Sequence, residues 1–325
     1  MKKILLAFVS FLPLAVTGCI VIPIGDLLRG PSFQEQVLLE GAGWFSKDKI
    51  ALIDIDGVIQ GKESPSLLFP AENTVSETKA QLDFARYDPD MKAVVIRISS
   101  PGGEVSACDV IRNEVKKFKA ETHLPVVACI TDQGASGAYY VAVASDTIFA
   151  QPTAIVGSIG VILQHFNISG LMEKIGVASS PVKSSPKKDL NSLFRPMTDE
   201  ERQILEKLVG DMYQRFIDVV AEGRPQLTKD EVRGLADGRV VSGVEAATLK
   251  LVDRVGYMAD AIEEARRAAE IESPTIIRYT RVPKSGANVY TQTGPNQPAA
   301  REASLNLTVG LDSTPRLYYL WRPGF

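Results

Sequence analysis

Residues Ala93 to Gly103 read AVVIRISSPGG, and this stretch decides the fold. Its first six residues are too few and too rich in β-branched side chains for a helix, so they predict a buried strand. Pro101, Gly102 and Gly103 then stop regular structure. The stretch therefore predicts a buried strand that ends in a specialised loop.

The same succession of strand, loop and helix recurs on both sides of this stretch. Runs of Ile and Val predict further strands over residues 49–60 and 124–130. Residues 75–86, 105–119 and 136–144 have the pattern or the small side chains of helices. This alternation favours an α/β architecture with largely buried strands over an antiparallel sandwich.

The second half of the chain is predicted to be mainly helical. A Ser or Thr followed three residues later by Glu can satisfy the free N–H groups at a helix start. This capping pattern occurs at Thr198–Glu201, Thr228–Glu231 and Ser242–Glu245. The first of these predicts an amphipathic helix that ends near Gly223.

Composition excludes several classes of protein. The chain has 325 residues, 45% of them hydrophobic and 23% charged, as in a soluble globular protein. A net charge of -3 without a basic stripe argues against nucleic acid as a partner. With only His123 and His165, a histidine-rich zinc site is implausible. We therefore expect neither a metal nor a cofactor.

Residues 1–19 read MKKILLAFVSFLPLAVTGC and have the form of an export signal. Two lysines precede an apolar stretch from Ile4 to Val16, which is shorter than the roughly 20 residues needed to span a bilayer. The last four residues resemble a bacterial lipobox, which implies a lipid on Cys19. We expect a lipid-anchored protein of the bacterial cell envelope on the extracytoplasmic, periplasmic side. An ordinary secreted protein with a free cysteine is the alternative.

The sequence divides into four segments. Residues 1–18 form the signal peptide, and residues 19–46 are rich in Gly and Pro, as expected of a tether without a core. Residues 47–273 contain the regular pattern and form the predicted folded domain. Residues 274–325 begin with one short strand and are otherwise predicted to be largely irregular.

Asp54 and Asp56 form the first candidate site. An apolar strand that ends in DxDG resembles the nucleophile loop of magnesium-dependent haloacid-dehalogenase-like phosphatases. That chemistry needs a second acidic cluster after a strand, and the nearest candidate, Asp211, lies in an amphipathic helix instead. Both aspartates are therefore more simply explained as residues at a strand end.

The second candidate site combines SSPGG (99–103) with DQGASGAYY (132–140). Glycines directly after a strand can expose N–H groups of the kind that form an oxyanion hole. Ser136, flanked by small residues at a predicted helix start, has an uncrowded hydroxyl suited to a nucleophile. On spacing alone, Ser136 is more simply explained as an N-cap.

A serine nucleophile needs a base. His123 and His165 lie in no special loop, whereas Lys183 follows an apolar stretch, residues 177–182, that could bury its stem and lower its pKa. Ser184 could orient the amine. Lys187 and Lys188 lie in a polar segment and are more simply explained as solvated charges; the list of candidate bases therefore favours Lys183.

Five ordered motifs resemble the signal peptide peptidase A family of serine proteases over about residues 47–270. They are SPGG, DQGASGAYY, SDTIFAQPTAIVGSIGV (145–161), KSSPKKD (183–189) and FRPMTDEER (194–202), and DGRVVSG (237–243) extends the resemblance. The resemblance implies a ClpP/crotonase-like α/β fold, a repeated strand-strand-helix spiral core with a helical C-terminal part. It also makes residues 47–273 a peptidase domain.

The resemblance assigns roles to individual residues. It implies a Ser-Lys dyad, with Ser136 as the nucleophile and Lys183 as the general base. Gly103 and the N–H of Gly137 fall where the family builds its oxyanion hole. Ser185 replaces the glycine that usually ends the KSG motif, which puts the shape of that loop in doubt.

The absence of an internal repeat indicates the short form of the family, which implies a ring-shaped homo-oligomer with a dyad assembled across neighbouring subunits. The predicted function is a membrane-anchored serine endopeptidase that degrades cleaved signal peptides and similar apolar peptides. The alternatives are the phosphatase above and a non-catalytic lipoprotein scaffold. The fold also hosts acyl-CoA enzymes, but the export signal argues against a cytosolic cofactor.

Overall fold

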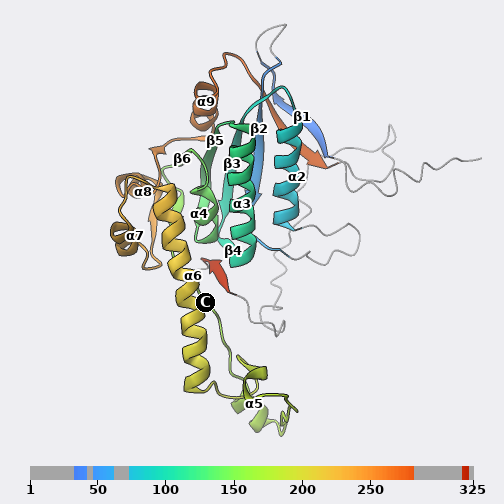
Figure 1. Ribbon diagram of the computed structural model, residues 1–325, viewed down its shortest axis with the longest axis vertical. Coiled ribbons are helices and arrows are strands. Elements are labelled where there is room, and N and C mark those ends of the chain that lie inside the picture. The colour runs from blue at the N-terminus through green and yellow to red at the C-terminus, as the bar shows by residue number, and fades with distance from the viewer. Residues whose placement is uncertain (1–32, 42–46, 62–72, 282–316, 322–325) are drawn as a thin grey trace, which may run out of the picture.

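The computed structural model describes residues 33–41, 47–61, 73–281 and 317–321 (Figure 1). The predicted signal peptide and the lipidation site at Cys19 lie outside these residues. In the part of the chain that is described, no helix is both long and apolar enough to cross a membrane.

A mostly parallel sheet forms the centre of the molecule (Figure 1). Its order is β1-β10-β2-β3-β5-β6-β9, and all neighbours along it are parallel except β1 and β10. In the middle of the sheet, Ile96 pairs with Ile53 on one side and Ala128 on the other. The bounds are β1 (Phe33–Leu39), β2 (Lys49–Asp56), β3 (Met91–Ser100), β5 (Val126–Ala135), β6 (Thr147–Ala150), β9 (Arg254–Val255) and β10 (Thr275–Arg281).

Helices cover both faces of this sheet, so the strands are buried as the sequence predicted. Alternate residues of β2 point to opposite faces, as a strand requires. Ile53 lies in the larger core with α2 (Thr74–Tyr87), α3 (Val105–Thr122) and α4 (Gly137–Ala142). Leu52 lies in the smaller core with α9 (Met258–Ala268). The predicted α/β fold is confirmed.

The capping patterns mark three helix starts, as predicted. Thr198 and Thr228 form complete capping boxes at α6 (Asp199–Gly223) and α7 (Lys229–Leu235). The Ser242 side chain accepts a hydrogen bond from the Glu245 backbone at the start of α8 (Gly243–Thr248). The second half of the domain is therefore mainly helical.

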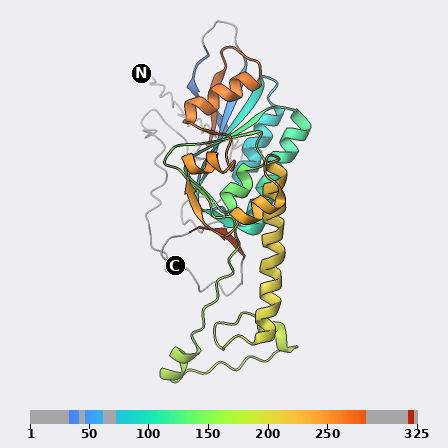
Figure 2. The same ribbon diagram turned by 90° about the vertical axis from the view of Figure 1, so that its left-hand side faces the viewer.

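An arm, residues 163–208, projects from the body of the molecule (Figures 1 and 2). It contains α5 (Ser169–Lys174), the short 3₁₀ helix η1 (Pro186–Asp189) and the N-terminal part of α6. The C-terminal part of α6 returns to the core, where Phe216 and Val220 are fully buried. The helix therefore connects the arm rigidly to the sheet.

Two strands of the sheet lie outside residues 47–273, the range predicted for the folded domain. β1 lies in the segment expected to be a tether. It joins the edge of the sheet by pairing with β10, but most of its residues are exposed. β10 is the short strand expected after Pro274, and it pairs with both β1 and β2. A further strand, β11 (Tyr318–Leu320), pairs with β4 (Gly102–Glu104).

Replacing Phe118 with Ala is expected to destabilise the fold by about 3–5 kcal/mol. Its fully buried ring belongs to the core between α3 and the sheet. Denaturant unfolding measures the loss. Lys117→Ala is the matched control, because that side chain is half exposed and forms a long ion pair of 3.9 Å with Glu121. Equal losses in the two variants would contradict this account of the core.

Candidate active site

Two loops meet where β3 and β5 end. The strands are parallel, and Ser100 pairs with Gly134, so the chain leaves both strands at the same edge of the sheet. A Cβ on Gly102 would lie 2.6 Å from the nitrogen of Gly137, and a Cβ on Gly137 would lie 3.1 Å from the nitrogen of Gly103. The structure thus brings Ser136, Gly137 and Gly103 together.

Ser136 has a backbone conformation that is rare for a residue with a side chain. Its φ is 52° and its ψ is −118°, and such strain persists only where neighbouring groups enforce it. The Ser136 N–H donates to the Gly157 carbonyl at 2.7 Å, and the Ser136 carbonyl accepts from the Tyr140 N–H at 3.0 Å. The side chain makes no capping hydrogen bond to α4, so the structure gives no support to the N-cap interpretation.

Gly103 presents its peptide group to the side of β4 where β11 lies. On the opposite side, Ile59 donates to the Gly102 carbonyl and accepts from the Glu104 N–H, both at 2.9 Å. Successive peptide groups of a strand point in opposite directions, so the Gly103 N–H points away from Ile59. A Cβ on Gly103 would collide with the Ile59 backbone, so this position requires glycine.

Residues 157–161 (GSIGV) and 237–243 (DGRVVSG) help to fix the position of Ser136 through backbone hydrogen bonds. β7 (Ile155–Gly157) lies between β5 and β8 (Val240–Ser242). The Ser158 N–H donates to the Arg239 carbonyl at 2.6 Å. This pairing fixes Gly157, which in turn holds Ser136.

The residues that follow Gly157 and Ser158 line a groove. Residues 159–161 form one part of this open groove of about 370 Å³, and residues of α6 and residues 236–238 form the rest.

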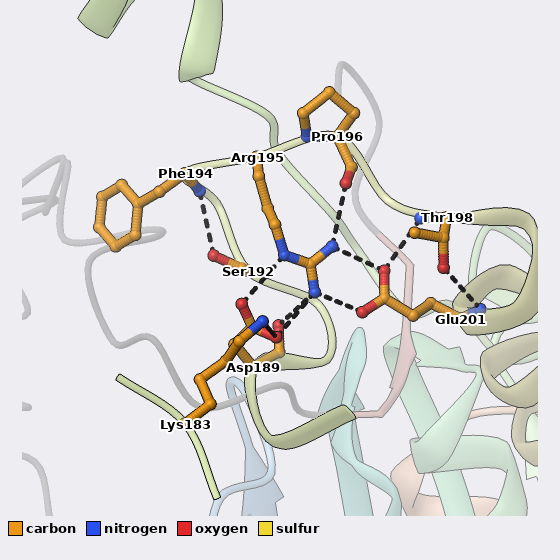
Figure 3. A network of polar contacts seen from close by, with 8 residues as sticks. All are labelled: Lys183, Asp189, Ser192, Phe194, Arg195, Pro196, Thr198 and Glu201. Carbon is orange, nitrogen blue, oxygen red and sulfur yellow. Dashed lines mark hydrogen bonds and ion pairs between the residues drawn. The ribbon is translucent and has the colours of Figure 1, made fainter. Parts of the chain in front are cut away.

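Lys183 lies on the arm between α5 and η1, where its side chain points toward Asp189 (Figure 3). Its Nζ donates to Asp189 Oδ1 at 2.8 Å. Residues 177–182, which precede Lys183, are exposed within the described chain, and Val182 is completely exposed. The burial that the sequence predicted for this stretch is therefore not found. A short apolar segment is buried only where something packs on it, and within the described chain nothing covers Val182. Ser184 is exposed as well.

Arg195 organises the segment that carries Lys183. Its guanidinium binds Asp189 through two hydrogen bonds of 3.0 and 2.8 Å and also binds Glu201, which completes the capping box with Thr198 (Figure 3). Hydrogen bonds from Arg195 and Lys183 hold the pKa of Asp189 well below its ordinary value. This network was not predicted from the sequence, although Arg195 and Glu201 both lie in the FRPMTDEER motif.

Comparison with known proteins decides the family. The family model "Peptidase family S49" matches residues 118–272, which include Ser136 and Lys183. A protein of Enterococcus faecium assigned as a signal peptide peptidase SppA is 34% identical over 245 residues, 75% of this chain and 70% of the relative. The chain belongs to peptidase family S49.

Two further relatives, both proteases, support this family assignment. A protein of Synechocystis assigned as a protease is 37% identical over 227 residues, 70% of this chain and 76% of the relative. Protease 4 of Salmonella typhi is 34% identical over 69% of this chain, which spans only 35% of that protein. The family resemblance and the enzyme class, a serine protease, are confirmed. The parallel sheet with its helices is the α/β, ClpP-like fold of that family.

Asp54 has a structural role in this S49 fold. Its carboxylate pairs with Arg97 on β3 at 2.7 Å and Arg278 on β10 at 3.2 Å. Burial raises the pKa of Asp54, while the two guanidinium groups oppose that shift. Asp54 thus joins three strands, and Asp56 is exposed at the end of β2. In the described part of the chain, no group of three or more His, Cys, Asp or Glu side chains could hold a metal ion.

Two cysteines are buried in the cores beside the sheet. Cys108 on α3 and Cys129 on β5 are free, completely buried thiols within the two cores. Cys108 also fills the space beside Gly137, because a Cβ on Gly137 would collide with its Sγ. This thiol therefore helps to fix the position of the Gly137 backbone.

Replacing Gly137 with Ala is expected to lower kcat for peptide hydrolysis by a factor of about 10²–10³, the cost of losing one oxyanion donor. The new Cβ would meet Cys108, the Tyr319 carbonyl oxygen at 3.0 Å and the Gly103 nitrogen at 3.1 Å, so the Gly137 N–H must move. Gly234→Ala on α7 is the control, since its Cβ would meet nothing within 4 Å. An unchanged kcat in Gly137→Ala would contradict the assignment.

The Arg195 network makes a prediction about pH. Hydrogen bonds from Arg195 and from the Thr198 backbone lower the pKa of Glu201 to about 2. Because this value is below the unfolded value of about 4.3, the ionised carboxylate stabilises the fold above about pH 4, and the effect is lost as the pH falls toward 2. Carbon-13 NMR of labelled glutamate should give a midpoint near 2.

The midpoint should rise toward about 4.3 in Arg195→Gln and stay low in Arg202→Gln, the control that removes a neighbouring arginine. A midpoint near 4 in the unaltered protein would contradict the network.

Proposed function

We propose that this chain is a membrane-anchored serine endopeptidase that degrades cleaved signal peptides and similar apolar peptides. The observation that carries the proposal is the strained backbone of Ser136, which lies beside Gly137 and Gly103 where two loops meet. The name of the Enterococcus faecium relative, a signal peptide peptidase, supports this class of substrate.

In the proposed reaction, Ser136 Oγ attacks the scissile carbonyl carbon while the neutral amine of Lys183 accepts the hydroxyl proton. The N–H groups of Gly103 and Gly137 stabilise the oxyanion of the tetrahedral intermediate. Lys183 then gives its proton to the leaving amine as the peptide bond breaks. Water, activated by the same amine, hydrolyses the acyl-enzyme and restores Ser136.

We further propose that Lys183 comes from a neighbouring subunit of a ring-shaped homo-oligomer. Within one chain, the Lys183 amine donates to Asp189 on the arm (Figure 3). The arm projects away from α4, at whose start Ser136 lies (Figure 1). In this proposal Lys183 leaves Asp189 and enters a drier site, because an amine that donates to a carboxylate is not free to act as the base for Ser136.

The exposed apolar side chains of the arm support this assembly. Exposed apolar groups of this extent are typical of surfaces that a partner covers. A second copy of the chain, packed against the arm, would bury these groups and remove water from around Lys183. They are Phe166, Leu171, Ile175, Val177, Val182, Phe194, Ile204 and Leu208.

The lipobox at Cys19 supports a lipid anchor and a place on the extracytoplasmic side of the bacterial envelope. Signal peptides have an apolar central region, and they are cleaved from exported proteins at the membrane. An enzyme anchored at that membrane would meet them where they are released. The anchor and the proposed substrate are therefore consistent.

The dyad can be tested with two inactive variants. Ser136→Ala and Lys183→Ala should each lower peptide hydrolysis by the detergent-solubilised enzyme at least about 10³-fold. If the two groups meet across subunits, co-expression in equal amounts should restore about a quarter of the wild-type activity, because half the serines and half the lysines are intact.

The control is Lys187→Ala, a half-exposed lysine that pairs with Glu200 at 2.5 Å and should leave hydrolysis intact. Activity should also be indifferent to EDTA. Retained hydrolysis in either inactive variant would refute the dyad. Co-expression without recovery would show that one chain supplies both groups.

A further inference from the structure

The segment that carries Lys183 is held by polar contacts and not by a core. Residues 173–188 are all exposed within the described chain. Asp189, directly after this stretch, has a side chain that is 15% exposed. Its carboxylate accepts hydrogen bonds from both Lys183 and Arg195 (Figure 3). The position of the Lys183 segment therefore depends on what holds Asp189.

The guanidinium of Arg195 joins two carboxylates. Its Nε donates to Asp189 Oδ2 at 3.0 Å, and one terminal nitrogen donates to Asp189 Oδ1 at 2.8 Å. The other terminal nitrogen donates to Glu201 Oε2 at 2.8 Å. A planar fork of donors can bind both carboxylates at once, which the single ammonium of a lysine cannot do with the same geometry. Asp189, Arg195 and Glu201 together form a clamp.

Glu201 is the fixed point of this clamp. The residue is 4% exposed, and its Oε2 also accepts from the Thr198 N–H at 2.9 Å. In return, Thr198 Oγ1 accepts from the Glu201 N–H at 3.2 Å. These two bonds are the capping box of α6, so the clamp is attached to the first turn of that helix.

Helix α6 connects the clamp to the core around the nucleophile (Figure 1). Near its other end, the fully buried Phe216 packs against Tyr140 of α4, with 5.1 Å between ring centroids. Ser136 lies at the start of α4. The segment of Lys183 is thus fixed to the same rigid body that holds Ser136 of its own chain.

The clamp does not need the amine of Lys183. Arg195 binds both carboxylate oxygens of Asp189, so the carboxylate keeps its position when the amine turns away. The lysine amine lies at the end of a flexible stem of four carbons. The backbone can therefore stay in place while the amine moves from Asp189 to a neighbouring serine.

We propose that Arg195 is a positioning residue for the general base of the peptidase. Through Asp189 and Glu201 it fixes the backbone of the Lys183 segment to α6, and the lysine side chain reaches Ser136 of a neighbouring copy from that fixed backbone. The proposal rests on the proposed Ser-Lys dyad. A displacement of about 1 Å in a catalytic group costs about 10²-fold in rate, which sets the size of the expected effect.

Kinetics of the full-length, detergent-solubilised enzyme give the first test. Arg195→Ala should lower kcat for peptide hydrolysis about 10²-fold and leave KM within about twofold, because the clamp acts on the base and not on the peptide. Arg195→Lys should stay at least about tenfold below the unaltered enzyme, since it keeps the charge but not the fork. Arg202→Ala removes an exposed arginine beside Glu201 and is the matched control. Full kcat in either Arg195 variant would overturn the proposal.

A double-mutant cycle tests whether Arg195 acts through Asp189. Asp189→Ala should lower kcat by a similar factor, and the double variant with Arg195→Ala should lose little more, because both changes remove the same clamp. Losses that multiply would show that the two residues act separately. A higher kcat in Asp189→Ala would show that Asp189 restrains the base. Either result would overturn the proposal.

Hydrogen exchange gives a readout that needs no catalysis. The N–H groups of Lys188, Leu190 and Ser192 are hydrogen-bonded within the segment. In the Ser136→Ala enzyme, adding Arg195→Ala should speed their exchange at least about tenfold, and adding Arg202→Ala should not. Unchanged exchange would overturn the proposal, whether or not the variant keeps its assembly.

These results separate the positioning role from the proposed function. Hydrolysis by the unaltered enzyme that depends on neither Ser136 nor Lys183 would refute the dyad itself. Hydrolysis that depends on both residues, with full kcat in Arg195→Ala, would leave the dyad standing and refute the role of Arg195 alone.

Discussion

The close approach of two backbone turns, one after β3 and one after β5, determines where every other group of the site can lie. A Cβ on Gly102 would displace the Gly137 nitrogen, one on Gly103 would displace the backbone of Ile59, and one on Gly137 would displace the thiol of Cys108. The parallel pairing of β3 with β5 provides this approach. The strained Ser136 is held there by Gly157, so the strain is maintained by the sheet and not by the loop alone.

The fold distributes the proposed machinery between a rigid body and an arm. Nucleophile and oxyanion donors lie at the end of a sheet that is buried on both faces, where positions are well defined. Lys183 lies on a segment whose apolar side chains are exposed within the described part of the chain, and Arg195 holds this segment through Asp189. In the proposed mechanism, Lys183 becomes a base only when a neighbouring copy changes its surroundings. Under that proposal, this division would couple activity to assembly.

Local signals in the sequence predicted the elements well and the long-range contacts poorly. The strand, the glycines and the capping boxes depend on residues within a few positions, so AVVIRISSPGG and Thr198 predicted what the structure shows. The burial expected around Lys183 was not found, because it depends on what packs against the segment. No pattern indicated that Tyr319 would pair with Gly103, which is more than 200 positions earlier in the chain. The position of β10 inside the sheet depends equally on distant partners.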